Sequence, residues 1–295
     1  MGSRNFPRAF RLKRLRKDAP RSSFRTRHPA MTDYPDLLSR HQYALVDCAG
    51  LFPESWHQAL PLIPIVPKEL KSDTDTMPAL LPLDPGALWF QHLLDHLEVV
   101  ESKRWKPILS CLLAVPEDVS LESLTWHLRD RLIVYSPQAR ALLRYYDSYI
   151  FPHFQRVLHP AQLQALYGSI TGWTVYFLKT EETEWITEPP PGIMEHVPRF
   201  WSVSTEQDAA LDRIGIVNQA LDIWRAKTRP WESLAEYQEM AAHMDAAIVR
   251  EQRNQPDAGE ETLAFEAVEW LQKYQNRDPV FKHSLNLQES NHGLQ

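Results

Sequence analysis

The chain has 295 residues, of which 43% are hydrophobic and 24% are charged, as is typical of a soluble globular protein. This length suffices for one large domain or for two lobes with a sizeable core. No run approaches the roughly eighteen apolar residues that a membrane helix needs. The two cysteines, Cys48 and Cys111, lie in apolar, strand-like runs, and we favour buried free thiols over a disulfide.

Charge is distributed unevenly along the chain. Residues 1–30 hold ten Lys or Arg and one acid, Asp18, which leaves 22 basic and 37 acidic residues in 31–295, a net charge of −15. A body this acidic argues against a nucleic-acid partner, because phosphate binding needs a basic surface. Residues 1–30 form a basic arm with three interpretations: a polyanion-binding tail, an Arg-rich transit peptide, or upstream sequence translated from a misplaced start. We favour the last interpretation, since the folded pattern begins only after Met31.

Apolar runs and capping residues predict alternating helices and strands in the first half of the chain. The expected elements are a helix over 34–43, a strand over 43–48, a strand over 79–83 with Pro82 at an edge or end, a helix over 87–100, a strand over 107–113, and a helix capped by Ser120. The expected inner faces of the two longer helices are Leu88, Leu93 or Leu94, and Leu97 in the first, and Leu121, Leu124 and Leu128 in the second.

The segment 132–158 predicts a hairpin followed by a helix. The apolar runs Leu132–Tyr135 and Ala141–Tyr146 flank a turn at Pro137, which presets its backbone and cannot donate to a ladder. Asp147 is expected to cap the helix, in which Pro152 is tolerable only within the first turn. The inner face of this helix is Ile150, Phe154, Val157 and Leu158.

After this segment the patterning changes from strand-like to helical. A short helix over 160–167 ends at Gly168, and strands over 173–178 and 184–187 form a hairpin around a polar turn. Glu188–Gly192 predicts a stiff, extended linker. Three amphipathic helices follow, with the stripes Leu211, Ile214, Val217, Leu221 and Trp224; Leu234, Tyr237, Ala241, Met244 and Ile248; and Leu263, Ala267, Trp270 and Tyr274.

These elements predict an α/β protein of the α+β class, with a small mixed β-sheet and flanking helices followed by a helical C-terminal lobe. The predicted divisions are a basic, disordered arm (1–30), an α/β lobe (31–188), a Pro-rich linker (189–204), a helical lobe (205–275) and a loose tail (276–295).

Residues 126–168 carry a recognisable pattern of His-Leu-Arg at 127–129, then a strand, a turn, Leu-Arg-Tyr-Tyr-Asp at 143–147, and Gly168. Over about Tyr43–Leu178 the chain resembles the DUF4123 family, bacterial adaptor-chaperones of the type VI secretion system. It departs from the family pattern in the turn at Pro137–Arg140, where members often carry glycine. It also departs at Ser148-Tyr149, where they often carry Pro-Arg.

The resemblance implies a function in binding. The chain would hold a cognate secreted effector in the bacterial cytoplasm and help to load it onto the secretion spike, whose protein is a second possible partner, with no cofactor, nucleic acid or membrane. The family-motif residues are His127, Arg129, Arg144, Tyr146 and Asp147. We interpret Arg129, Arg144 and Asp147 as a structural ion pair, because an inward arginine in an acidic body needs a carboxylate. Contact with a partner is the alternative.

Aromatic and Met residues gather around the first break between the C-terminal helices, and such side chains suit a groove for apolar peptide surface. The candidate partner-binding residues are Trp224, Trp231, Tyr237, Met240 and Met244. The alternative is that they are ordinary core of a helical bundle, in which case their rings are not exposed.

The sequence contains no convincing catalytic pattern. His92 and His96 share a helix face, but Leu93 stands where zinc proteases need a glutamate, so we expect exposed histidines rather than a metal site. No Gly-x-Ser-x-Gly or phosphate-binding glycine motif is present. Four carboxylates follow apolar runs, namely Asp47, Asp84, Asp118 and Asp147. We expect a protein that is not an enzyme; the competing hypotheses are a hydrolase that uses these carboxylates and a self-associating scaffold.

Overall fold

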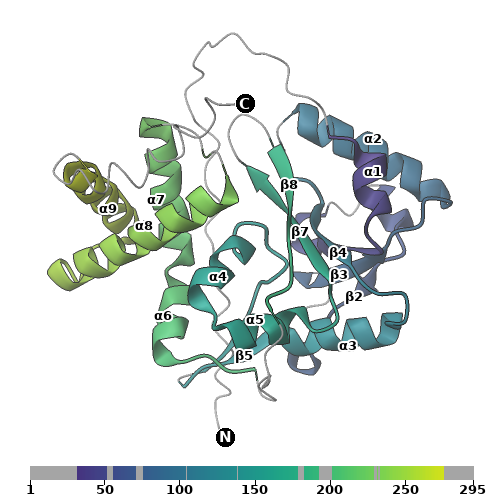
Figure 1. The fold of residues 1–295 in the computed structure, drawn as a ribbon, viewed down its shortest axis with the longest axis horizontal. Coiled ribbons are helices and arrows are strands. Elements are labelled where there is room, and N and C mark those ends of the chain that lie inside the picture. The colour runs from purple at the N-terminus through teal and green to yellow at the C-terminus, as the bar shows by residue number, and fades with distance from the viewer. Residues whose placement is uncertain are drawn as a thin grey trace, which may run out of the picture. The chain divides into compact units, whose positions relative to one another are not determined.

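The computed structural model describes residues 32–51, 56–70, 76–103, 105–137, 139–178, 183–192, 201–228, 231 and 233–275 (Figure 1). The predictions for the arm (1–30), the polar hairpin turn (179–182), much of the linker (193–200) and the tail (276–295) lie outside the described residues. The chain divides into two compact units, one ending at Ala209 and the other beginning at Ala210.

Six strands of the first unit form one sheet, in the order β2-β3-β1-β4-β7-β8. They are β1 (Tyr43–Asp47), β2 (Ile63–Pro64), β3 (Pro78–Pro82), β4 (Leu109–Ala114), β7 (Gly172–Leu178) and β8 (Thr183–Glu188). The α+β class is therefore confirmed, and Pro82 lies at the end of its strand as predicted. Every neighbouring pair is antiparallel, where a mixed sheet was expected. Strands β3 and β4, which α2 connects, run in the same direction but are not neighbours, because β1 lies between them.

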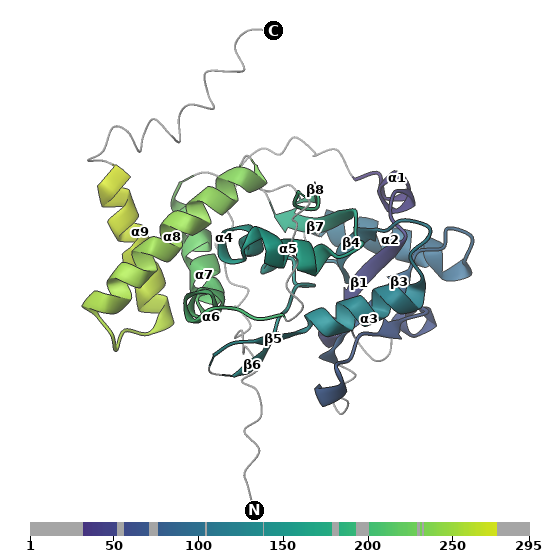
Figure 2. The ribbon, with the colours of Figure 1, turned by 60° about the horizontal axis from the view of Figure 1, so that its bottom comes forward.

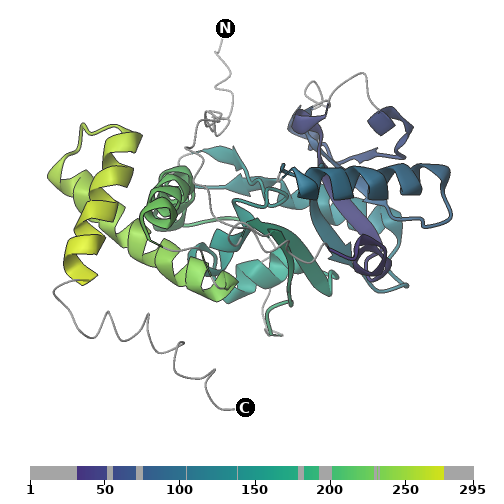
Figure 3. The same cartoon turned by 90° about the horizontal axis from the view of Figure 1, so that it is seen from above.

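Helices lie on both faces of this sheet. They are α1 (Tyr34–Ser39), α2 (Leu88–Ser102), α3 (Leu121–Arg131), α4 (Phe154–Val157) and α5 (Pro160–Tyr167), with short 3₁₀ helices η1 (Cys48–Gly50), η2 (Trp56–Ala59), η3 (Lys68–Leu70) and η5 (Phe151–His153). Figures 1 and 3 show α1 and α2 side by side on one face, and Figure 2 shows α3 and α5 on the opposite side from α2.

The inner faces of α2 and α3 were predicted correctly except at their first residues. Leu93, Leu94 and Leu97 of α2 are buried against β1, β3 and β4, but Leu88 is 94% exposed. In α3, Leu121 is likewise exposed. Both are the first helical residue, and side chains tilt toward the helix N-terminus, so these two project beyond the end of the sheet-facing surface. Ser120 caps α3 as predicted, its Oγ accepting from the N–H of Ser123 at 3.1 Å.

The predicted hairpin is present, but its second strand is shorter than expected. Strand β5 (Ile133–Tyr135) pairs with β6 (Arg140–Leu142), after which the backbone turns instead of continuing to Tyr146. The predicted helix cap at Asp147 is wrong. Its carboxylate accepts the N–H of Tyr149 in a local turn, and the helical segment begins at η5, with Pro152 in its first turn as expected.

This turn directs aromatic side chains onto the second face of the sheet. Trp173 of β7 is fully buried, and the ring of Phe151 stacks on it at 4.8 Å between centroids. The rings of Tyr145 and Tyr167 each lie 5.7 Å from Trp173. The hydroxyl of Tyr145 donates to the carbonyl of Leu128 at 2.8 Å, which ties the turn to the end of α3.

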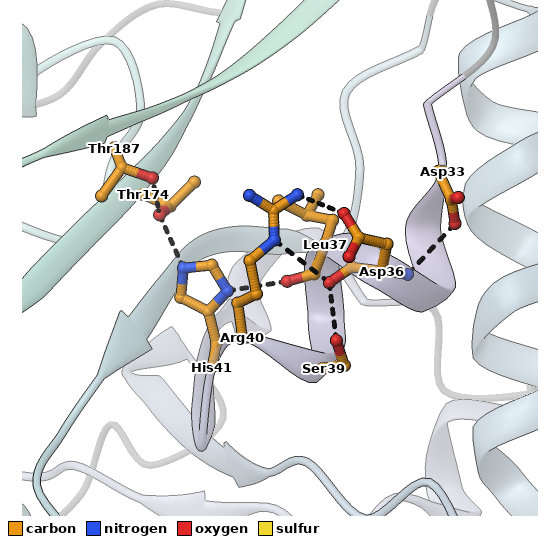
Figure 4. A network of polar contacts seen from close by, with 8 residues as sticks. All are labelled: Asp33, Asp36, Leu37, Ser39, Arg40, His41, Thr174 and Thr187. Atoms are coloured by element: carbon orange, nitrogen blue, oxygen red, sulfur yellow. Dashed lines mark hydrogen bonds and ion pairs between the residues drawn. The ribbon is translucent and has the colours of Figure 1, made fainter.

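A chain of polar side chains joins the end of α1 to strands β7 and β8 (Figure 4). His41 Nδ1 lies 2.8 Å from the carbonyl of Leu37, which can only accept, so Nδ1 carries the hydrogen. Nε2 lies 2.7 Å from Thr174 Oγ1, which lies 2.7 Å from Thr187 Oγ1, so a neutral His41 accepts from Thr174 while Thr174 accepts from Thr187. Burial of His41 lowers its pKa and so favours this neutral form.

Four helices make up the rest of the described chain, and three of them form the bundle of the second unit. They are α6 (Thr205–Asp212), α7 (Ile214–Lys227), α8 (Leu234–Asn254) and α9 (Glu260–Gln275). Three helices were expected here, but the first predicted stripe, Leu211–Trp224, is divided between α6 and α7. Helices α7, α8 and α9 contact one another in all three pairs. No helix among the described residues combines the length and apolar character needed to cross a bilayer.

Candidate partner-binding site around the Asp47–Asp147 ion-pair cluster

Four charged side chains of the first unit converge on one ion-pair cluster, made of Asp47, Lys106, Arg144 and Asp147. Arg144 lies 3.1 Å from the carboxylate of Asp147 and 3.6 Å from that of Asp47. The ammonium of Lys106 lies 3.6 Å from Asp147 and 4.0 Å from Asp47. Each carboxylate is therefore shared by two cations, so both negative charges are balanced in place.

The sheet and the turn after β6 bring these residues together. Asp47 is the last residue of β1, and Lys106 precedes the antiparallel β4, so both stand at the same end of the sheet. Asp147 is held by its own turn, because its carbonyl accepts the N–H groups of Ile150 and Phe151, each at 2.9 Å. Its carboxylate thus has little freedom to leave the cluster.

The carboxylates lie deeper than the cations. The side chains of Asp147 and Asp47 are 5% and 16% exposed, whereas those of Arg144 and Lys106 are 21% and 35% exposed. Burial lowers the pKa of Arg144, but the neighbouring Asp147, Tyr146 and Asp47 outweigh it, and the net pKa is raised. Burial raises the pKa of the adjacent Tyr146 to about 12, so its phenol is neutral. The cluster therefore presents positive charge toward water.

Two exposed aromatic rings border the cluster. Trp105, next to Lys106 in the chain, is 49% exposed and Tyr149 is 45% exposed. The ammonium of Lys103 lies 4.5 Å from the centroid of the Trp105 ring, and that of Lys106 lies 5.5 Å from the Tyr149 ring. Trp and Tyr side chains are enriched at surfaces that bind other polypeptides.

The other family-motif residues have structural positions. His127 Nε2 donates to the carbonyl of Leu166 at 2.8 Å, and its ring lies against the Cα of Gly168. Arg129 does not join Asp147: its guanidinium lies 5.1 Å from the ring of Trp126 instead. The expected ion pair thus contains Arg144 and Asp147 but not Arg129. Asp47 and Lys106 are the other two members of the cluster.

The candidate residues of the helical lobe are all inside the protein. The exposed fractions are 4% for Trp224, 3% for Trp231, 8% for Tyr237, 1% for Met240 and 0% for Met244. The ring of Trp231 meets that of Tyr237 at 5.9 Å, and Tyr237 Oη donates to Asn218 Oδ1 at 2.7 Å. They form no exposed aromatic surface, and a bundle core accounts for their burial.

The remaining candidates do not assemble into a reaction centre. His92 is exposed, while His96 is half-buried with its ring 5.5 Å from that of His57. Asp84 and Asp118 are exposed, and Asp84 accepts the N–H of Gly86. Within the described residues, no group of three or more His, Cys, Asp or Glu is placed to hold a metal ion.

Sequence reasoning found part of this site and missed the rest. It singled out Arg144 and Asp147 as an ion pair and Asp47 as a carboxylate after a strand. It did not connect Asp47 to Asp147, one hundred residues away, and it missed Lys106, Trp105 and Tyr149. A long-range pairing of this kind leaves no periodic signal in the sequence.

Comparison with known proteins finds one family match, which covers part of the site. Searches of the curated proteins and of the solved structures returned no match. A family model described as a domain of unknown function, DUF4123, matches residues 65–165, a range that includes Trp105, Lys106, Arg144 and Asp147. The chain is therefore similar to the DUF4123 family over residues 65–165.

Proposed function

We propose that the chain is an adaptor-chaperone that binds a cognate type VI secretion effector in the cytoplasm and helps to load it onto the secretion spike. The observation that carries this proposal is the match of residues 65–165 to DUF4123, a family associated with effector adaptors of these systems. The chain would act by binding a polypeptide rather than by transforming a small molecule.

The surface features of the first unit support a role in binding. Trp105, Tyr135 and Tyr149 each expose more than two fifths of their surface in this unit. Large rings held at a surface supply contact area at a low cost in side-chain entropy, and they are enriched at protein interfaces. The first unit is therefore the better candidate for effector binding, because the aromatic residues proposed in the helical lobe are buried.

The test is co-expression of the full chain with the products of the neighbouring reading frames, followed by affinity capture. One secreted-type protein is expected to co-purify in a fixed ratio, and its soluble yield is expected to fall when the chain is omitted. Unchanged solubility and no co-purifying product from any neighbouring frame would contradict the proposal. Light scattering of the chain alone tests the alternative of a self-associating scaffold.

One observation favours a carboxylate-dependent hydrolase as a second candidate, namely the convergence of Asp47 and Asp147. Two carboxylates are the usual acid and base of such enzymes. Here, however, each lies within 4.0 Å of both Lys106 and Arg144, which hold the negative charges in ion pairs. Turnover of an ester, glycoside or peptide panel by the native chain, lost in a folded Asp47→Asn variant, would favour the hydrolase.

A further inference from the structure

The loop between α2 and β4 and the turn after β6 present two aromatic rings and two lysines on the first unit. We name Lys103, Trp105, Lys106 and Tyr149 the basic aromatic patch. Each ring carries one ammonium near its face, at 4.5 Å for Lys103 on Trp105 and 5.5 Å for Lys106 on Tyr149. Both rings remain close to half exposed despite these contacts.

The charges beneath the patch determine which partners it attracts. Asp47 and Asp147 are buried below Lys106 and Arg144, so the anions face inward and the cations face water. Lys106 lies 3.6 Å and 4.0 Å from the two carboxylates, and its side chain is 35% exposed, so an incoming carboxylate can still approach it. Lys103 is exposed and forms no ion pair among the described residues.

We propose that the basic aromatic patch binds an acidic segment of the partner polypeptide that also carries apolar side chains. This inference rests on the proposed adaptor function and specifies the chemistry of its contact. Carboxylates of the segment would pair with Lys103 and Lys106, and its apolar side chains would pack on Trp105 and Tyr149. A nucleic acid is a poorer fit, because residues 31–295 carry a net charge of −15 and repel an extended polyanion.

Trp126 provides a matched control on the same unit. It is 49% exposed, as Trp105 is, and it also has cations over its ring, Lys68 at 5.6 Å and Arg129 at 5.1 Å. It therefore reproduces the exposure and charge of one ring without belonging to the patch. Trp105→Ala is conservative for the fold, since the hydroxyl of Tyr176 donates to the backbone carbonyl of Trp105, which alanine retains.

The test titrates the full chain with a fluorescein-labelled peptide in which Asp and Glu alternate with Phe and Leu, and with a peptide in which Lys replaces the acids. Saturable binding of the acidic peptide is expected, weakened about tenfold or more by Trp105→Ala and by Lys103→Glu, and weakened further as salt is raised. Trp126→Ala and Lys68→Glu are expected to stay within about twofold of the native chain. Equal binding of both peptides, equal losses in the control variants, or no saturable binding would overturn the inference.

The same four variants are then compared in the capture experiment. Capture of an effector by the native chain that survives both patch substitutions would refute the patch and leave the adaptor function standing. If the native chain captures no effector, the adaptor function fails, and the peptide titration still decides whether the patch binds acidic segments.

Discussion

Among single residues, Asp147 makes several kinds of contact at once. Its carboxylate faces Arg144 and Lys106 and accepts the N–H of Tyr149, and its carbonyl organises the start of η5. Removing one member of such a cluster leaves a cation without its counter-charge in a site that is only partly open to water.

We predict that Asp147→Asn lowers the free energy of unfolding by about 2 kcal/mol. This is less than the ~3–5 kcal/mol of a fully buried pair, because Arg144 and Lys106 keep some contact with water. Urea denaturation measures the change. Asp36→Asn is the control: Asp36 pairs with Arg40 on the surface of α1, and a loss below about 1 kcal/mol is expected there. Equal losses in the two variants would argue against the cluster.

A second prediction at this scale concerns His41 and pH. Burial lowers the pKa of His41, and the nearby Arg40 adds to this, while the hydrogen bond to Leu37 opposes it. The unfolded chain therefore takes up a proton at a higher pH than the folded one does. Stability is full above the unfolded pKa of about 6.5 and falls as the pH drops through the folded pKa.

The melting temperature is expected to fall between pH 7.5 and pH 5. His41→Gln is expected to reduce the slope of melting temperature against pH. The exposed His92→Gln is the control and should leave the slope unchanged. Buried or half-buried His57, His96 and His127 also have lowered pKa values, each chiefly through burial, so the slope is reduced but not abolished. An identical slope in native chain and His41→Gln would contradict the assigned neutral role.

Among the elements, α3 and α5 depend on one glycine for their contact. Gly168 ends α5 with φ of +57°, a backbone region that favours glycine, and a Cβ there would lie 2.4 Å from the ring of His127. His127 comes from α3 and donates to Leu166 of α5. The sequence pattern predicted the end of the helix at Gly168, but the close approach of a second helix is visible only in the structure.

We predict that Gly168→Ala destabilises the protein by about 2–3 kcal/mol, combining backbone strain with displacement of the His127 ring. Gly192→Ala is the control, because nothing lies within 4 Å of a Cβ added there, and a change within about 0.5 kcal/mol is expected. Chemical denaturation of both variants measures the difference. If the double variant His127→Ala with Gly168→Ala recovers none of the loss, strain alone explains it.

For the whole molecule, the division into two units predicts that core substitutions act locally. Met244 is fully buried in the bundle of α7, α8 and α9, whereas Phe265 of α9 is 46% exposed. We predict that Met244→Ala costs the helical unit about 2–5 kcal/mol and that Phe265→Ala costs much less. Calorimetry is expected to show that the transition of the helical unit shifts in the first variant while that of the sheet unit stays in place. A common shift of both transitions would contradict independent cores.

The sequence by itself determined most of the longer helices and strands, because burial on one face imposes a periodicity of 3.6 or 2 residues that is visible in the sequence. Caps such as Ser120 and Gly168 were equally readable, since their chemistry is local. Only the tertiary structure decided that Asp47, Lys106, Arg144 and Asp147 share one cluster, and that the helical-lobe aromatics are core while Trp105 is surface. These outcomes depend on contacts between residues far apart in the chain, and local sequence patterns do not predict such contacts.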